Sequence, residues 1–249
     1  MASKTKTKIG IIGAGAWGTA LSNILAKNQS VVLWAKEKNV CDNINKNQEN
    51  KRFLPKIKLS KKICCTTEIN DICDCDILFL VIPVQYLSSV LGKLKNSINT
   101  KTIFVCCSKG LEMNSLKLPS QIVSAIFPKN KVAIISGPNF AAEIAKGLPA
   151  ATVVASKNDE VSKKIAHLIK SPTLRPYLSS DIIGSQIAGA LKNIYAIASG
   201  IVVGKKYGEN AVASIISRSF AEITTVAKTM DAKKSTLAGL SGMGDLFLT

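Results

Sequence analysis

Apolar runs alternate with amphipathic stretches over the first 180 positions of this 249-residue chain. Short, continuous apolar runs are typical of buried strands, and we predict them at residues 9–12, 31–34, 76–83, 102–108, 132–136, 152–155 and 173–178. Amphipathic spacing predicts helices between them, at residues 19–27, 84–94 and 159–170. This alternation predicts an α/β fold, in which helices cover both faces of a mostly parallel sheet.

The pattern changes after Asp181. Residues 182–203 are apolar nearly all round and predict one long helix, buried in the middle of a helical domain. Residues 210–230 predict a second long helix and residues 233–240 a short third. We therefore divide the chain into an α/β domain, residues 1–180, and an all-α domain, residues 181–249. The sequence is still apolar at residues 245–249, so we expect the all-α domain to be incomplete here.

A glycine motif joins the first predicted strand to the first helix, with the sequence Gly13-Ala14-Gly15-Ala16-Trp17-Gly18. In G-x-G-x-x-G the first glycine allows a tight turn, the second lets the backbone approach a pyrophosphate, and the third lets the helix pack on the strand. The helix N-terminus offers free N–H groups to the phosphates. With a strand before it and a helix after it, this motif predicts a Rossmann-like dinucleotide-binding domain rather than a structural glycine turn.

The second predicted strand, residues 31–34, bears on the choice of cofactor. NAD sites place an acidic residue about 20 residues after the glycines to hold the ribose 2′-hydroxyl. Here Lys36 stands at that point and Glu37 follows it. Because Lys36 could pair with a 2′-phosphate, we predict that NADPH is accepted at least as well as NADH. Dual use of NADP and NAD, with Glu37 reaching the ribose, stays open.

Composition narrows the class of protein. The net charge is +17, but 30 of the 33 basic residues are scattered lysines, which argues against a nucleic-acid-binding surface. The positive charge fits attraction of small phosphorylated anions as well as it fits nucleic acid. The seven cysteines are odd in number and lack zinc-ligand spacing, which indicates reduced thiols, no metal site and a cytoplasmic location. No uncharged apolar run reaches the roughly 18 residues of a membrane span, so we expect no membrane insertion.

Titratable residues in apolar surroundings are candidates for chemistry. Lys192 lies within the long apolar helix, so it either extends out to solvent or faces a cleft as a general acid and base. Asp245 lies in a glycine-flanked apolar run, where it could orient a lysine ammonium or cap a helix. His167 is the sole histidine and falls on an amphipathic surface helix, so a His–Asp proton relay is not expected.

Two segments follow predicted strands, where open α/β sheets bind ligands. Ser108-Lys109-Gly110 follows one strand, and a glycine turn opens a helix in Ser136-Gly137-Pro138-Asn139-Phe140-Ala141 after another. A lysine at a strand end and a helix N-terminus both suit a phosphate or a carbonyl oxygen. A solvated lysine and an ordinary capped turn are the alternatives.

As an ordered set, these segments resemble the bacterial NAD(P)-dependent glycerol-3-phosphate dehydrogenases along the whole chain. The matching segments are 13–21, 53–55, 108–112, 136–145, 190–194 and 239–246. The resemblance implies reversible hydride transfer between NAD(P)H and dihydroxyacetone phosphate, giving sn-glycerol 3-phosphate for phospholipid synthesis. A homodimer is a candidate assembly, because apolar faces of the incomplete all-α domain would favour self-association.

The same resemblance implies roles for individual residues. Lys192 would exchange a proton with the C2 oxygen of the substrate, and Asp245 would lie beside the reacting hydroxyl. Lys109 would contact both substrate and cofactor. The other substrate contacts implied are Gly137 and Asn139, and the other nucleotide contacts implied are Ala16, Trp17 and Ala141. The glycine motif adds Gly13, Gly15 and Gly18 to the predicted nucleotide contacts, and the position after the second strand adds Lys36.

Two features depart from the family pattern. Position 139 is usually Ser or Thr, whereas Asn139 changes the reach of the hydrogen-bonding group. The family also continues into an Asn-x-x-Ser-Arg-Asn segment that binds substrate and cofactor, and this segment would follow Thr249. We therefore expect this chain to bind cofactor but to turn over substrate poorly. Alternatives are a catalytically impaired NAD(P)-binding protein and a related lysine-using dehydrogenase for hydroxy acids or sugar acids.

Overall fold

One eight-stranded sheet organises the first part of the computed structural model, which describes residues 7–248. Its order is β3-β2-β1-β4-β5-β6-β7-β8, and every neighbouring pair is parallel except β6 and β7. The strands are β1 (Ile9–Ile12), β2 (Val31–Trp34), β3 (Ile63–Thr66), β4 (Ile77–Leu80), β5 (Ile103–Cys106), β6 (Val132–Ser136), β7 (Ala150–Ser156) and β8 (Leu174–Ser179). The predicted mostly parallel sheet is confirmed.

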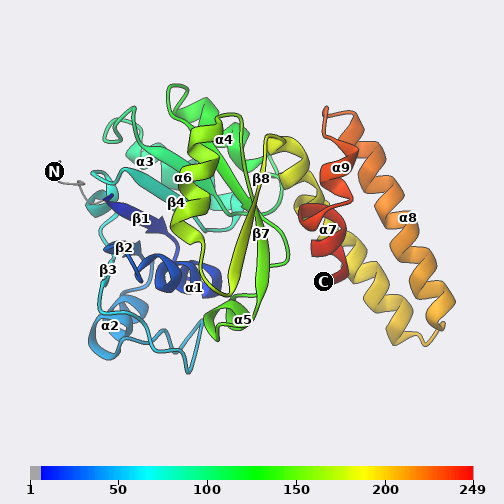
Figure 1. Cartoon of the computed structure of the whole chain (residues 1–249), viewed down its shortest axis with the longest axis horizontal. Coiled ribbons are helices and arrows are strands. Elements are labelled where there is room, and N and C mark those ends of the chain that lie inside the picture. The colour runs from blue at the N-terminus through cyan, green and yellow to red at the C-terminus, as the bar shows by residue number, and fades with distance from the viewer. Residues whose placement is uncertain (1–6, 249) are drawn as a thin grey trace.

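Helices cover both faces of this sheet (Figure 1). One face packs against α1 (Ala16–Leu25), α2 (Lys38–Asn47) and α6 (Asp159–Ile169). The other packs against α3 (Leu87–Leu94), α4 (Pro119–Ile126) and the start of α7 (Ile182–Gly204). Successive residues of a strand point to opposite faces of the sheet, so Phe79 packs into the core on the first face and Leu80 into the core on the second. Strands buried on both faces are why the sequence shows continuous apolar runs.

Some elements differ from the prediction. The helix expected at residues 84–94 opens with a 3₁₀ turn, η2 (Val84–Tyr86), before α3. The sequence reading omitted β3, α2 and α4, as well as the short 3₁₀ segment η1 (Ile69–Ile72). α2 has few apolar positions, and the other three segments are at most eight residues long, so each gives only a short pattern in the sequence. The predicted glycine turn does open a helix, α5 (Ala141–Ala145).

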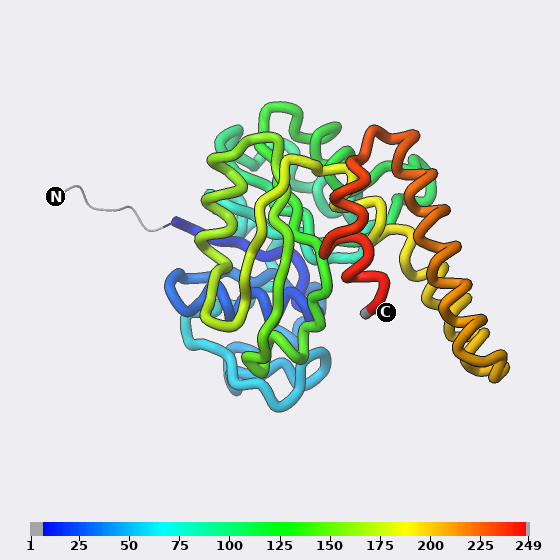
Figure 2. Tube along the Cα trace, turned by 45° about the vertical axis from the view of Figure 1, so that its right-hand side comes forward, coloured from blue at the N-terminus to red at the C-terminus, as the bar shows by residue number. Residues whose placement is uncertain are grey.

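The remaining helices form a separate layer beyond β6 and β7. Here α7 and α8 (Glu209–Lys228) make an antiparallel pair that projects away from the sheet (Figure 2). Three short segments, α9 (Lys234–Leu237), the π-helical turn η3 (Leu240–Gly244) and α10 (Asp245–Leu248), return the chain towards the sheet. This return brings residue 245 close to the carboxyl ends of the strands, where open α/β sheets bind ligands.

The expectation that α7 is buried along its length is wrong for its second half. Its residues from Ile182 to Lys192 are mostly buried, whereas Ile194, Ile197 and Ile201 are 62%, 67% and 57% exposed. The reason is that the first half packs on the sheet and on η3, while α8 lies along one side of the second half. Hydropathy predicted that this helix is apolar, but not how many elements of the fold pack against it.

By length and composition alone, α7 is also the one helix among residues 7–248 that could cross a membrane. It carries Lys192 near its middle, and its first half packs inside the protein.

All seven cysteines are free, and burial raises the pKa of six of their thiols, that of Cys75 to about 11. Thiols of this kind stay protonated and behave as small apolar side chains.

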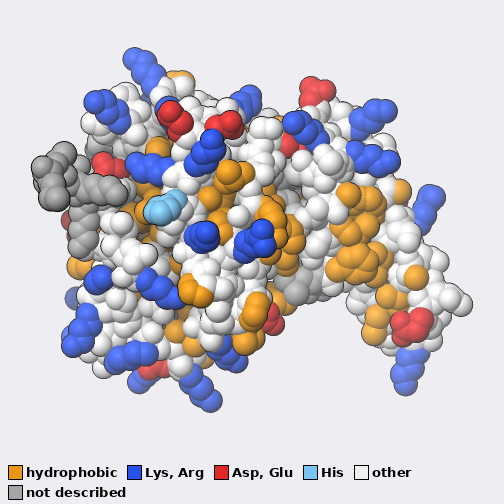
Figure 3. All heavy atoms as spheres, in the orientation of Figure 1, with side chains coloured by type: hydrophobic (Ala, Val, Ile, Leu, Met, Phe, Trp, Pro, Cys, Tyr) orange, Lys and Arg blue, Asp and Glu red, His pale blue; other side chains and the backbone are white. Residues whose placement is uncertain are grey.

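Positive charge is spread diffusely over the face of the molecule seen in Figure 3. Figure 3 shows Lys and Arg side chains spread over the visible face rather than gathered in one stripe. Hydrophobic side chains gather over the helical part on the same view. A scattered distribution of this kind differs from the clustered basic patch of a nucleic-acid-binding surface.

Candidate active site

The glycine motif forms the turn between β1 and α1. Gly13 has φ +117°, and a side chain there would meet the carbonyl oxygen of Val81 at 2.7 Å. A Cβ on Gly18 would lie 1.8 Å from the carbonyl oxygen of Gly13. Both positions therefore require glycine for close packing. A Cβ on Gly15 would meet nothing within 4 Å, so the space over this residue is open.

The N-terminus of α1 at this turn has no competing anion. Gly15 is the N-cap residue, no side chain caps the helix, and the first turn, which contains Ala16 and Trp17, holds no acidic residue. The backbone N–H groups and the partial positive charge at the helix start are available to a phosphate. Together with the open space over Gly15, this geometry fits the pyrophosphate of a dinucleotide.

The strongest cluster of charges joins the two parts of the chain. Asp245, at the start of α10, is only 2% exposed. Its Oδ1 lies 3.2 Å from Nζ of Lys192 on α7, and its Oδ2 accepts a hydrogen bond from Nζ of Lys109, which follows β5. A buried carboxylate needs such partners because desolvating an unpaired charge is costly. Of the two roles considered for Asp245, the structure shows the contact with a lysine, and two lysines make it.

Lys109 reaches this carboxylate across the α7 surface. Its side chain is 34% exposed, and its Nζ also donates to the carbonyl oxygen of Gly137 at 3.4 Å. A Cβ on Gly189 of α7 would lie 3.6 Å from Cδ of Lys109, so a small residue leaves room for the lysine. Burial lowers the pKa of Lys109, and Lys192 adds to this, while the Asp245 carboxylate acts in the opposite direction. The net direction is a pKa below the ordinary value of 10.5.

The segment after β6 places Gly137 and Asn139 beside this cluster. Gly137 has φ +123°, a conformation that favours glycine, and this turn exposes its carbonyl oxygen to Lys109. The side-chain amide of Asn139 donates to the hydroxyl of Thr152 at 3.0 Å, and Thr152 in turn donates to the carbonyl oxygen of Ser136. The Oδ1 atom of Asn139 is buried and has no hydrogen-bond partner. Thr152 thus fixes the amide nitrogen and leaves the buried Oδ1 as an acceptor without a partner.

Lys36 and Ala141 lie at other edges of the site. Ala141 is the first residue of α5, which packs against α1. Lys36 follows β2, which β1 and β4 separate from β5, so it is not part of the Asp245 cluster. Its Nζ lies 6.0 Å from the ring centroid of Tyr86. His167 is exposed on α6, as predicted.

Sequence reasoning missed a buried asparagine at the glycine loop. Asn50 is 1% exposed, and its amide donates to the carbonyl oxygen of Ala14 at 2.9 Å and to the hydroxyl of Thr19 at 2.8 Å. It therefore fastens a distant turn to the predicted nucleotide site. Asn50 lies in a polar stretch of the sequence, so no apolar pattern marks its burial.

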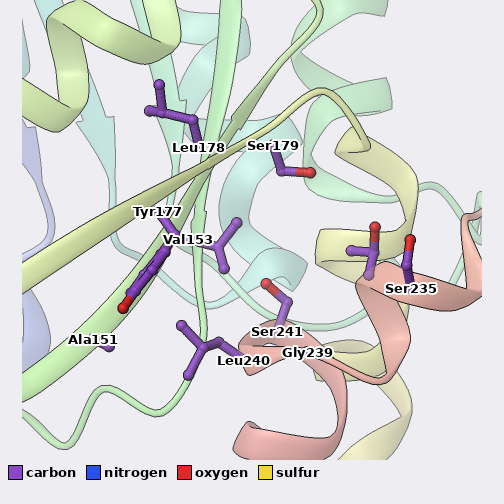
Figure 4. A pocket seen from close by; sticks show the side chains of 10 residues that line it. Ala151, Val153, Tyr177, Leu178, Ser179, Ser235, Gly239, Leu240 and Ser241 are labelled. Atoms are coloured by element: carbon purple, nitrogen blue, oxygen red, sulfur yellow. The ribbon is translucent and has the colours of Figure 1, made fainter.

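A separate hollow of about 460 Å³ opens between β7, β8, α9 and η3 (Figure 4). Apolar side chains such as Val153 and Leu240 line it together with hydroxyl groups, and none of its ten lining residues is charged. It therefore offers no cationic side chain to pair with a substrate phosphate. Across residues 7–248, no three His, Cys, Asp or Glu side chains gather as a metal site would need.

Comparisons with known proteins agree with this geometry. The protein-family model for the N-terminus of NAD-dependent glycerol-3-phosphate dehydrogenases matches residues 8–162. The family model for the C-terminus of the same enzymes matches residues 181–249. A glycerol-3-phosphate dehydrogenase of Parvibaculum lavamentivorans, which is named as using NAD(P), is 44% identical over 97% of this chain and 73% of its own. A second, from Caulobacter vibrioides, is 43% identical over 98% of this chain and 74% of its own.

Solved structures give the same result. The crystal structure of glycerol-3-phosphate dehydrogenase from Coxiella burnetii superposes with a TM-score of 0.94 at 35% identity, covering 98% of this chain and 75% of that one. The yeast enzyme from Saccharomyces superposes with a TM-score of 0.88 at 26% identity, over 98% of this chain and 77% of that one. The chain therefore belongs to the family of NAD-dependent glycerol-3-phosphate dehydrogenases.

Proposed function

We propose that this chain interconverts dihydroxyacetone phosphate and sn-glycerol 3-phosphate with NADPH or NADH. The observation that carries this proposal is the Asp245 carboxylate, which is buried and holds two lysines from different parts of the chain. Two ammonium groups on one buried carboxylate provide both a proton donor and a positive charge at one place. Reduction of a ketone to an alcohol requires both, because negative charge develops on the carbonyl oxygen.

In this mechanism Lys192 exchanges the proton with the substrate. When the cofactor is bound, its nicotinamide supplies the hydride that adds to C2 of dihydroxyacetone phosphate. Lys192 donates a proton to the C2 oxygen, and in the reverse direction it accepts that proton from glycerol 3-phosphate. Asp245 holds the Lys192 ammonium in place, at 3.2 Å.

Lys109 stabilises the oxygen on which negative charge develops. Its ammonium group lies on the same carboxylate and beside the Gly137 carbonyl. We assign Asn139 to a substrate hydroxyl, because its buried Oδ1 needs a donor. Gly13, Gly15, Gly18, Ala16 and Trp17 would hold the pyrophosphate side of the cofactor, with Ala141 and Lys109 towards the nicotinamide and Lys36 towards the ribose.

The cellular setting is part of the same proposal. We assign the enzyme to the cytoplasm, where it supplies glycerol phosphate for phospholipid synthesis. Free, buried thiols suit a reducing compartment. We interpret α7 as a core helix rather than a membrane span, because it buries Lys192 against Asp245. The exposed apolar residues on its second half form the kind of surface through which a homodimer would assemble.

Steady-state kinetics on the purified chain test this function. We expect oxidation of NADPH that depends on dihydroxyacetone phosphate, at a rate at least equal to that with NADH. The matched controls are a 2-oxo acid and an oxidised sugar acid at the same concentration. Turnover of these acids without turnover of dihydroxyacetone phosphate would contradict the assignment, and cofactor binding without any turnover would indicate a binding protein. A preference for NADH of about tenfold would contradict the role of Lys36 at a 2′-phosphate.

The lowered pKa of Lys109 predicts a pH dependence. Because burial favours its neutral form, Lys109 loses its proton at a lower pH than an ordinary lysine, and its stabilisation of negative charge is lost with it. We expect kcat/KM for dihydroxyacetone phosphate to fall on the alkaline side, with a midpoint below 10.5. The Lys109→Arg variant keeps its charge and should lose this alkaline fall. An unchanged midpoint in that variant would assign the titration to another group.

A further inference from the structure

A short turn after α2 is fixed to the predicted nucleotide-binding loop. The backbone N–H of Leu54 donates to the carbonyl oxygen of Asn50 at 2.9 Å and closes the turn. The Asn50 side chain then fastens this turn to Ala14 and Thr19, at the start of α1. The side chains between Asn50 and Leu54 are thereby held next to the glycine motif, although they lie more than 30 positions away in sequence.

Arg52 extends from this turn to the end of β2. Its Nη1 lies 3.8 Å from Oε1 of Glu37, and its guanidinium lies 4.9 Å from the ring centroid of Phe53. Both partners of the ion pair are well exposed, at 55% for Arg52 and 40% for Glu37. An ion pair that is this long and this exposed contributes little to stability, so a ligand can readily open it.

Glu37 is the N-cap residue of α2 and stands one position beyond Lys36, which occupies the place where a Rossmann-like site meets the adenosine ribose. A carboxylate after the second strand accepts the ribose 2′-hydroxyl of NAD, and an arginine nearby accommodates the 2′-phosphate of NADP. A guanidinium binds phosphate with two parallel hydrogen bonds, which a lysine cannot do. Lys36 is also present but extends towards Tyr86, whereas Arg52 reaches Glu37 itself.

We propose that Arg52 determines the use of NADP(H): its guanidinium separates from Glu37 and binds the 2′-phosphate. When the ribose carries no phosphate, Glu37 accepts the 2′-hydroxyl and Arg52 remains beside it. The Arg52–Glu37 pair thus lets one site take both cofactors, and Lys36 provides additional positive charge. This inference rests on the nucleotide site of the proposed function, but it concerns cofactor choice alone.

Binding measurements on the whole chain separate this role from general electrostatics. Dissociation constants are measured for NADPH, NADH, adenosine 2′,5′-bisphosphate and AMP at one low salt concentration. We expect Arg52→Ala to weaken NADPH and the bisphosphate by about tenfold or more, and NADH and AMP by less than about twofold. Glu37→Gln removes the competing carboxylate, so it should tighten NADPH and weaken NADH.

Lys51 gives a matched control, because it is exposed, precedes Arg52 on the same turn and carries the same charge. Lys51→Ala should leave the ratio of the NADPH and NADH dissociation constants unchanged. Two results would overturn the inference: an unchanged ratio in Arg52→Ala, whether both cofactors weaken equally or neither weakens, or the same change of ratio in Lys51→Ala. If the unsubstituted chain bound none of the four ligands, the proposed function would fail as well. Binding of both cofactors with a ratio insensitive to Arg52 would overturn this inference alone.

Discussion

Replacing Lys192 with methionine is expected to lower the turnover number for dihydroxyacetone phosphate by about two to four orders of magnitude. Lys192 is 8% exposed and lies against Asp245, and in the proposed mechanism it is the group that passes a proton to the substrate. Methionine has a similar length and an apolar stem, and therefore preserves the packing of α7. The dissociation constant for NADPH should stay within a few-fold of the parent value, because the glycine motif lies on other elements.

The measurement is steady-state kinetics together with a cofactor titration on the same preparation. Lys205→Met provides the control, since Lys205 follows α7 directly and is exposed. This control should keep the parent rate. Retention of more than about a tenth of the parent rate by Lys192→Met would show that another group transfers the proton.

The glycine motif shows how far sequence alone can lead. A strand, three glycines and a helix are local features, and the structure confirms the elements on either side of the predicted turn. The roles of Gly13 and Gly18 in close packing also follow from local geometry. Local pattern is sufficient here because each contact joins residues near one another in sequence or on adjacent strands.

Asn50 illustrates the opposite case. Its partners, Ala14 and Thr19, are 36 and 31 positions away, so its burial depends on a turn that the apolar pattern does not mark. The pairing of Arg52 with Glu37 was missed because Arg52 lies on this same unmarked turn, although both side chains of the pair are exposed. Polar residues that are buried through tertiary hydrogen bonds look like surface residues in a sequence.

The long apolar helix was predicted in its extent but misjudged in its burial. An apolar circumference predicts that a helix will be covered, and the first half of α7 is covered by the sheet and by η3. Beyond Lys192, packing against α8 leaves Ile197 and Ile201 exposed. Composition reports the surroundings that a helix requires, whereas burial depends on which elements the fold brings to each of its sides.

Replacing Asp245 with asparagine is the second substitution for which we expect a large effect. Asparagine keeps the shape of the side chain but removes the charge that holds Lys109 and Lys192 together. The two ammonium groups then repel each other in a poorly solvated site, and Lys192 loses the partner that orients it. We expect turnover of dihydroxyacetone phosphate to fall by about 10²-fold or more. The free energy of unfolding should fall by about 3–5 kcal/mol.

Urea denaturation and initial-rate kinetics measure the two effects separately. Asp231→Asn is the matched control, because Asp231 is exposed and has a positive φ that asparagine tolerates, so this variant should behave as the parent. The double variant Asp245→Asn, Lys192→Met removes both buried charges, and we expect it to recover part of the lost stability but none of the activity. If Asp245→Asn kept both the stability and the rate of the parent, the carboxylate would not organise the two lysines. The expected result, recovery of stability in the double variant without recovery of activity, would support two separate roles: Asp245 compensates buried charge, and Lys192 carries the proton.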